Sequence, residues 1–169
     1  MAESRSRVKK EILVFCAVAI GLFVVGVVMS GSPSSGRAPR IPISILYRTG
    51  KESHYMVFHA TTPQQLTEGL MNYTFDNCTA NQTNVSSSCT DEIVGELFSL
   101  GNLTSACFWM KNTPEPLVQA WLSENGTVSY IYDGVPYSTD AICANGSTVL
   151  ELGENLGIPL QVGDVVTVG

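Results

Sequence analysis

Charged residues are scarce in this sequence, and basic residues are especially scarce after its first thirty positions. Of the 169 residues, 14% are charged and 44% are hydrophobic, a composition that excludes a wholly disordered chain. After position 30, thirteen acidic residues face five basic ones, Arg37, Arg40, Arg48, Lys51 and Lys111. A body this acidic repels phosphate, so nucleic acid is not an expected partner.

Catalytic signatures are also missing. The patterns G-x-S-x-G, H-E-x-x-H, Walker A and G-x-G-x-x-G are absent, so the common hydrolase, metalloprotease and nucleotide sites are not expected. His54 and His59 are the only histidines, and positions five apart on a strand point to opposite faces. No Cys-x-x-Cys pair offers a thioredoxin-like or zinc site. We therefore expect no catalytic residue, no metal and no cofactor.

One long hydrophobic run predicts a membrane anchor. Residues 12–29 carry no charged side chain, and as a helix they would span about 27 Å, close to a bilayer core of about 30 Å. The basic tail 1–11 places the N-terminus in the cytoplasm by the positive-inside rule. A cleaved signal peptide is the alternative, because small residues follow the run.

The rest of the chain is expected outside the cytoplasm as one domain. Residues 30–40 are rich in Ser, Gly and Pro and predict a flexible linker, which leaves 41–169 for the folded body. The sequence therefore predicts a single-pass protein of the cell membrane with its C-terminal domain outside.

Glycosylation motifs and cysteines indicate the same compartment. Four cysteines follow the hydrophobic run, and an even number predicts two disulfides in an oxidising compartment. Three pairings are possible. We favour Cys78–Cys89 and Cys107–Cys143, because the first closes a polar loop that burial cannot order. Seven Asn-x-Ser/Thr motifs also follow the run, at Asn72, Asn77, Asn81, Asn84, Asn102, Asn125 and Asn145.

Residue patterns predict a mainly β domain, a compact curled or barrel-like antiparallel sheet of about seven strands with one short helix. Thr62, Pro63 and Gln65 match an N-cap, a first-turn proline and a capping box, so the helix is expected over 62–71. The polar stretch 72–94 is expected to be a disulfide-pinned surface insertion. Strands are expected over 41–48, 53–60, 95–100, 105–110, 117–122, 127–132, 148–152 and 165–168.

Two hairpins are expected among these strands. Residues 95–100 and 105–110 flank Gly101, and residues 117–122 and 127–132 flank an Asn-Gly turn, which is a strong hairpin signal.

Several stretches of the chain resemble one known family. They are TPQQLTEGLM, GELFSL, CFWMKNTPEPL, ENGTVSYIYDGVPYST, TVLELG and GIPLQVGDVV, in this order. Over about residues 53–168 the chain resembles the domain of unknown function 192 family (DUF192), small extracytoplasmic domains of bacteria and archaea. The resemblance implies a β-rich, barrel-like fold and no established reaction. Its motif residues are expected to serve the fold, namely Gly69, Leu70, Met71, Phe108, Thr113, Gly163 and Asp164.

Two positions depart from the family pattern. Val118 stands where family members commonly have Asp, and Glu96 stands where they commonly have Met, so those family side chains cannot act here. Residues 72–94 look like an insertion. Dense glycosylation motifs in this family would suit an archaeal cell envelope.

The best candidates for a ligand or partner site are Trp109, Met110, Lys111 and Asn112. An aromatic ring, a thioether, a cation and an amide could line a pocket in which Lys111 holds an anion. The alternative is structural, with Met110 in the core and Trp109 and Lys111 on the opposite face.

Acidic side chains offer weaker candidates. Glu151 and Glu154 could form an acid–base pair, but a solvated acidic turn is the simpler interpretation. Asp164 is most simply a turn residue that accepts hydrogen bonds from backbone N–H groups. Asp91, Glu92 and Glu96 do not have a recognised calcium-site spacing.

These observations predict a non-enzymatic binding or interaction module of the cell envelope. Its partner would be a small ligand or another envelope protein, for example in a membrane assembly that the domain serves as an accessory subunit. We expect binding at 41–71 or 103–124, which lack glycosylation motifs. The alternative is a hydrolase-like envelope enzyme with a pocket formed by Trp109, Lys111, Asn112, Glu151 and Asp164.

Overall fold

A computed structural model describes residues 36–75 and 92–169 of the chain. The predicted span over 12–29 and the predicted disulfide Cys78–Cys89 lie outside these residues. So do the glycosylation motifs at Asn77, Asn81 and Asn84. Within the two described stretches, no helix is both long and apolar enough to cross a membrane.

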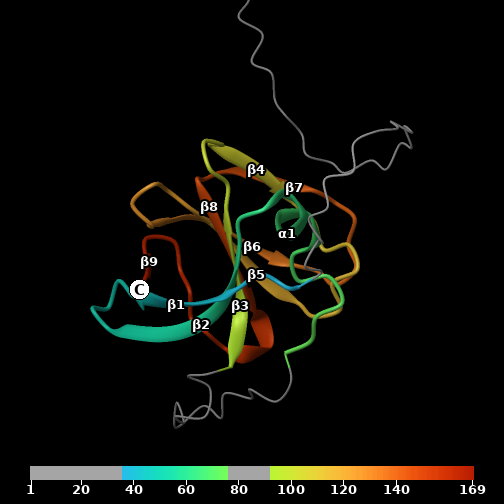
Figure 1. Ribbon diagram of the computed structural model, residues 1–169. Coiled ribbons are helices and arrows are strands. Elements are labelled where there is room, and N and C mark those ends of the chain that lie inside the picture. The colour runs from blue at the N-terminus through green and yellow to red at the C-terminus, as the bar shows by residue number, and fades with distance from the viewer. Residues whose placement is uncertain (1–35, 76–91) are drawn as a thin grey trace, which may run out of the picture.

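The described residues form a mainly β domain with one short α-helix, as predicted (Figure 1). Seven strands make one sheet in the order β6-β5-β8-β3-β2-β1-β9, and β4 pairs with β7 in a separate ribbon. The helices are α1 (Pro63–Glu68) and a 3₁₀ turn, η1 (Glu154–Leu156). The strands are β1 (Arg40–Leu46), β2 (Glu52–Ala60), β3 (Ile93–Ser99), β4 (Ser105–Phe108), β5 (Leu117–Leu122), β6 (Val128–Gly134), β7 (Ile142–Asn145), β8 (Thr148–Gly153) and β9 (Val165–Val168).

The large sheet is mixed and open. Strand β2 runs parallel to β3, whereas the other pairs of this sheet are antiparallel. A parallel pair needs a long connection, and the chain supplies one that leaves β2 through α1 before β3 begins. The sheet is not closed, although an isolated bridge joins Thr127 to Val165 near its two edges. The prediction of an antiparallel sheet is therefore wrong for the β2–β3 pair.

Helix α1 begins as the sequence predicts. The Thr62 hydroxyl accepts a hydrogen bond from the Gln65 backbone N–H, and the Gln65 side chain accepts one from the Thr62 backbone N–H. This reciprocal pair is the predicted capping box. The helix ends at Glu68, earlier than predicted, where Gly69 takes a φ of 48° and lies against the Phe98 ring.

One predicted hairpin is confirmed and the other is wrong. Strands β5 and β6 pair around the Asn-Gly turn as expected. Strands β3 and β4 belong to different sheets, because β3 pairs with β2 and β8 while β4 pairs with β7. The prediction missed β7, whose four residues alternate between partly buried and exposed and contain no long apolar run.

A disulfide closes the β4–β7 ribbon. Cys107 and Cys143 are directly paired, with Cα atoms 4.0 Å apart, and they form the predicted bond. Their separation of 36 residues corresponds to about 4 kcal/mol of loop-closure free energy on the chain-entropy model. The bond holds the two strands of the ribbon together.

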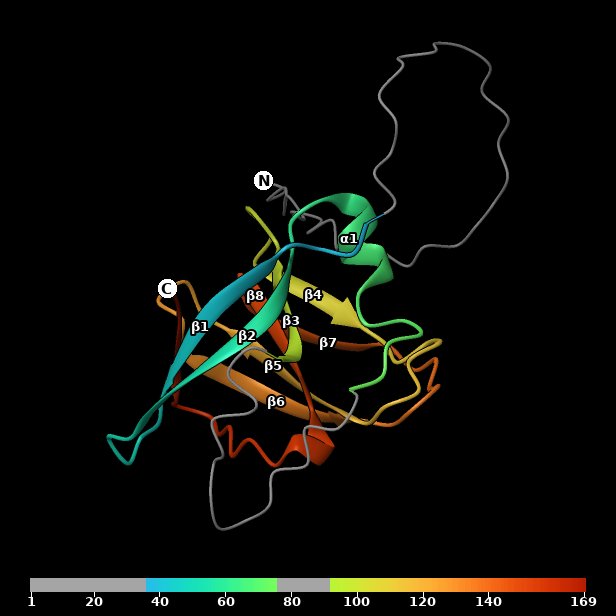
Figure 2. The same cartoon turned by 60° about the horizontal axis from the view of Figure 1, so that its bottom comes forward.

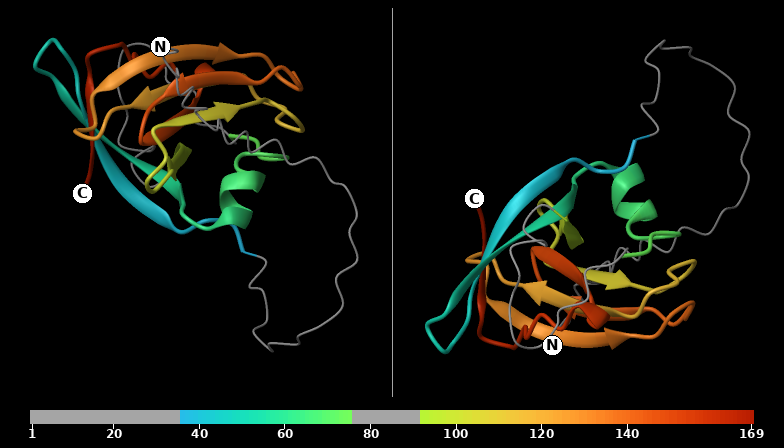
Figure 3. Two further views of the ribbon diagram at one scale, coloured as in Figure 1. Left: turned by 90° about the horizontal axis from the view of Figure 1, so that it is seen from above. Right: turned by 90° about the horizontal axis from the view of Figure 1, so that it is seen from below.

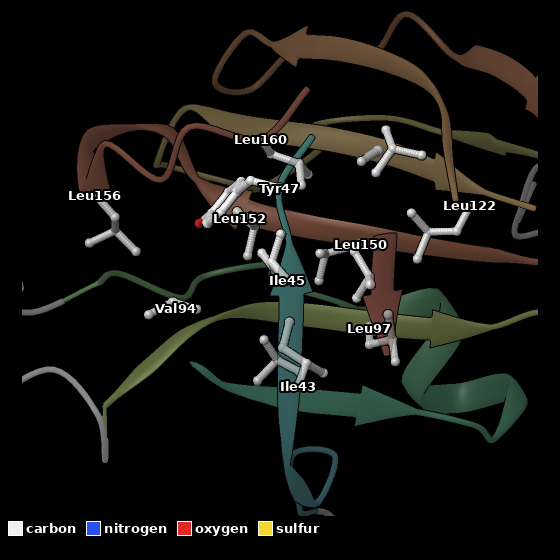
Figure 4. Packing of buried hydrophobic residues seen from close by; sticks show 14 residues of the cluster. Ile43, Ile45, Tyr47, Val94, Leu97, Leu122, Leu150, Leu152, Leu156 and Leu160 are labelled. Atoms are coloured by element: carbon white, nitrogen blue, oxygen red, sulfur yellow. The ribbon is translucent and has the colours of Figure 1, made fainter. Parts of the chain in front are cut away.

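Both faces of the central strands are covered. One face packs in a core of Ile, Leu and Val side chains, where Figure 4 shows Ile45 of β1 close to Leu150 and Leu152 of β8. The sheet curves so that β1 and β2 lie across this core from β5 and β6 (Figure 3). The other face packs beneath α1 and the β4–β7 ribbon, around Phe98 and Trp121.

Packing begins before β1, inside the stretch predicted to be a linker. The Arg37 guanidinium lies over two rings, with distances from its Cζ to the ring centroids of 5.2 Å for Phe58 and 4.6 Å for Tyr73. Ala38 is 5% exposed, and the His59 backbone N–H donates to the Pro39 carbonyl at 2.8 Å. The folded domain therefore includes residues from Arg37 onward, and Figure 2 shows this segment passing beside α1.

Candidate functional site

Three polar side chains lie side by side at the centre of the sheet. Glu96 of β3 is paired with Glu151 of β8, and Glu151 is paired with Gln119 of β5. Paired residues on neighbouring strands point to the same face, and the exposed fractions are 1% for Glu96, 4% for Glu151 and 0% for Gln119. We call Glu96, Gln119 and Glu151 the polar row.

The polar row is short of hydrogen-bond donors. Gln119 Nε2 donates to Glu151 Oε1 at 2.8 Å and lies 3.7 Å from the Met110 sulfur. Glu96 Oε2 and Gln119 Oε1 are buried and have no hydrogen-bond partner. Buried acceptors without partners are unfavourable, so the row leaves two oxygens that a donor from elsewhere would satisfy.

Burial raises the pKa of both carboxyl groups. Desolvation, followed by repulsion from Glu151, raises the pKa of Glu96 to about 8, and attraction to Arg37 lowers it by less. Desolvation raises the pKa of Glu151 to about 7, against a lowering by the hydrogen bond from Gln119. Both groups therefore retain protons at pH values where exposed glutamates have lost them.

A cavity of about 470 Å³ opens beside the polar row, and Glu151 forms part of its lining. Helix α1 and residues 69–71 form one wall, and residues 103–109 form the opposite wall. Figure 3 shows α1 facing β4 on this side of the sheet. The lining is mostly apolar and includes Leu66, Leu70, Phe98, Leu103, Phe108 and Trp109.

The charges around this cavity are mainly negative. Glu68 lines it from α1, and the repulsion of Glu68 adds to the raised pKa of Glu96. Arg37 lies at the same end of α1, with its Nη1 3.5 Å from the Gly69 carbonyl oxygen. Three carboxyl groups, the Arg37 guanidinium and the exposed Lys111 ammonium, which lies 5.0 Å from the Trp109 ring centroid, thus surround this part of the fold.

The structure separates the four predicted ligand residues. Trp109 lines the cavity, whereas Met110 is 2% exposed and packs in the core. Lys111 is exposed, with its Nζ 5.0 Å from the centroid of the Trp109 ring. Asn112 takes a φ of 56° in a turn, where its carbonyl accepts a hydrogen bond from the Asn72 backbone N–H. Trp109 is therefore the member of the group that faces the cavity.

Of the two glutamates considered as an acid–base pair, one lies where the sequence did not predict it. Glu151 is buried in mid-sheet, so its interpretation as part of a solvated turn is wrong, while Glu154 is exposed on η1. The signal was present, because apolar residues flank both Glu96 and Glu151 in strands that are buried on both faces. Of the residues suggested for an envelope enzyme, the cavity lining includes Trp109 and Glu151 but not Lys111, Asn112 or Asp164.

Asp164 holds backbone groups together. Its carboxylate accepts the Arg48 N–H at 2.9 Å and the Gln161 N–H at 2.7 Å, and the residue is 2% exposed. It thereby ties the end of β1 to the turn before β9, where Gly163 takes a φ of 93°.

Histidines and glycosylation motifs lie away from the polar row. His54 Nδ1 is 2.7 Å from the Ser44 hydroxyl, and His59 Nε2 is 2.8 Å from the Ser99 hydroxyl. The four motif asparagines in the described residues are all exposed, at Asn72, Asn102, Asn125 and Asn145. Asn145 is the last residue of strand β7.

The raised pKa values predict a stability that falls as pH rises. The folded domain holds protons that the unfolded chain releases above its ordinary glutamate pKa of 4.5, so unfolding becomes easier from there to about pH 8. Each such proton contributes a slope of about 1.4 kcal/mol per pH unit to the free energy of unfolding. Urea unfolding of the native domain between about pH 5.5 and 8 measures the slope.

Matched variants test which side chains cause the fall in stability with pH. Glu96→Gln and Glu151→Gln should each flatten it, because an amide does not titrate, whereas the exposed Glu154→Gln should leave it unchanged. A native domain whose stability is constant or rises over this pH range would contradict the assignment.

Comparisons with known proteins agree with this fold. A structure from Sinorhizobium meliloti, provisionally described as a transcription regulator, is 24% identical with a TM-score of 0.62, over 79% of this chain and 96% of that one. A protein of unknown function from Novosphingobium aromaticivorans is 26% identical with a TM-score of 0.58, over 80% of this chain and 89% of that one. No curated protein matches. The model of the DUF192 family, described as uncharacterized ACR, matches residues 44–168, and the chain therefore belongs to the DUF192 family.

Proposed function

We propose that this domain binds a small, largely apolar molecule in the cavity between α1 and the β4–β7 ribbon. The observation that carries the proposal is that residues distant in the sequence meet around one cavity. Its lining includes residues 69–71, residues 107–109, Thr113 and Glu151. These positions fall in the stretches on which the family resemblance rests.

The size and lining of the cavity support a binding role. Ligand sites commonly have volumes of about 300–1,000 Å³, apolar walls and a few fixed polar groups. Here the volume is about 470 Å³, the walls carry Phe98, Phe108 and Trp109, and Glu151 supplies a fixed polar group.

The walls are also preorganised. The capping box fixes the start of α1, and the Cys107–Cys143 disulfide fixes the opposite ribbon. A site that is already shaped loses less conformational entropy on binding, which favours affinity.

We further place the domain outside the cytoplasm, held to the cell membrane by residues 12–29. The hydrophobic run, the basic tail before it, the Cys107–Cys143 disulfide and the exposed motif asparagines support this setting. The two facing walls of the cavity lie within 41–71 and 103–124, the stretches without glycosylation motifs, and the motifs at Asn72 and Asn102 directly adjoin them. An envelope protein as partner is the second candidate, and the same two stretches would serve it.

The binding proposal predicts that a bulky side chain on the inner wall will close the site. Thr67 lines the cavity from α1, so Thr67→Trp should fill it and weaken binding of the uncharged fluorescent probe Prodan at least about tenfold. Gln64→Trp is the matched control, because Gln64 is exposed on the same helix and does not line the cavity. Fluorescence titration measures both. Equal Prodan binding by the two variants would contradict the cavity as the site.

The membrane proposal is tested by fractionation of cells. The full chain should remain in the membrane fraction after a high-salt wash, because a hydrophobic span is not released by salt. A chain secreted without residues 1–29 should appear in the soluble fraction. A full chain that is soluble without detergent would contradict the anchor.

A further inference from the structure

We infer that the ligand of this cavity is an amphipathic primary amine, whose ammonium group binds the oxygens of the polar row and whose apolar body lies against Phe98, Phe108 and Trp109. The inference deepens the proposed binding function and depends on it. It identifies the chemistry of the ligand from the groups that the polar row leaves unsatisfied.

Once the Glu96 and Glu151 carboxyl groups are ionised, the unsatisfied groups of the polar row are all acceptors. Glu96 Oε2 and Gln119 Oε1 are buried without a partner, and the Gln119 amide already donates to Glu151 Oε1 and to the Met110 sulfur. The three residues come from adjacent strands and point to the face that bears the cavity, and Glu151 reaches its lining. A ligand that completes this arrangement must bring donors, and a primary ammonium brings three of them on one atom.

Charge favours a cation over a neutral donor. Glu68 of α1, Glu96 of β3 and Glu151 of β8 supply up to three negative charges when ionised, against two positive charges, those of Arg37 and of the exposed Lys111 beside Trp109. The Arg37 guanidinium already lies over the Phe58 and Tyr73 rings. A second cation beside Glu96 and Glu151 would be attracted strongly, because the surroundings are buried and of low polarity.

An organic cation fits better than a metal ion. Hard cations such as Ca²⁺ require six or more oxygen ligands, or several retained waters. The described residues contain no cluster of three or more His, Cys, Asp or Glu side chains that could hold a metal. The apolar walls of the cavity instead suit the hydrocarbon portion of an amine.

Competition with bound Prodan tests the inference. Octylammonium, octanol and octanoate share one apolar chain and differ in charge, so their relative affinities report the polar row. At about pH 9, where Glu96 and Glu151 are ionised, octylammonium should displace Prodan at a concentration at least about tenfold lower than octanol, and octanoate should be weakest because the carboxylates repel it.

Protons and the ammonium compete for the same carboxylates. Octylammonium should therefore bind more tightly at about pH 9 than at about pH 6, while the amine itself stays charged at both. The affinity of octanol should change little over the same range, since no charge on octanol senses the carboxylates.

Isosteric variants test whether Glu96 and Glu151 cause the preference for octylammonium over octanol. Glu96→Gln and Glu151→Gln should each remove most of the preference for octylammonium over octanol and leave the affinity for octanol within about twofold. Glu154→Gln, an exposed glutamate three positions from Glu151, should behave as the native protein does. Glu96→Met is a second variant, which removes the carboxyl with a side chain that suits an apolar site if the amide disturbs folding.

Each outcome decides between the two proposals. Equal displacement by octylammonium and octanol, or a preference that survives Glu96→Gln and Glu151→Gln, would overturn the amine assignment while the binding function stands. Displacement of octylammonium by millimolar Ca²⁺ would also overturn it in favour of a metal site. Failure of the native domain to bind Prodan or any of the three octyl compounds would overturn both proposals.

Discussion

Strands β3, β8 and β5 are buried on both faces, and the rest of the domain is arranged around that constraint. On one face they pack against β1 through Ile, Leu and Val side chains. On the other they lie beneath α1 and the β4–β7 ribbon. Gly95 allows β3 and β8 to approach, since any side chain there would collide with the Glu151 backbone. A polar residue in these strands is thereby removed from water on either face.

Two glutamates and a glutamine nevertheless occupy this central position. Hydrophobic side chains of similar volume would cost less free energy to bury, because ionised carboxyl groups lose hydration and repel one another. The row also leaves Glu96 Oε2 and Gln119 Oε1 unpartnered, and its third member, Glu151, lines a cavity. Polar groups that are buried without hydrogen-bond partners near an open cavity are characteristic of ligand-binding sites. A bound ligand can supply the hydrogen bonds that the fold does not provide. The polar row therefore connects the stability of this domain to its proposed function.

Local signals predicted much of the fold, and long-range pairing accounts for what they missed. The capping box of α1 and the Asn-Gly hairpin depend on residues close in sequence, so both were predictable. The parallel β2–β3 pair and the β4–β7 ribbon depend on residues far apart, and short strands carry little periodicity. The candidate site also combines residues that local sequence signals identify with residues that only long-range pairing brings together. Trp109 was identified by its residue type, whereas Glu96 and Glu151 become neighbours only when β3 pairs with β8.

In our proposal, Glu96 and Glu151 are buried carboxyl groups that bind a cation. Carbon-13 NMR of glutamate side-chain carboxyl carbons, assigned with the Glu96→Gln and Glu151→Gln variants, measures both groups directly as pH changes. We expect two resonances that titrate near pH 7 and 8 in the free domain, and a shift of both midpoints to lower pH when octylammonium is present. Two resonances that titrate near the ordinary value of 4.5 and do not respond to octylammonium would show that the two groups are not a buried cation-binding pair.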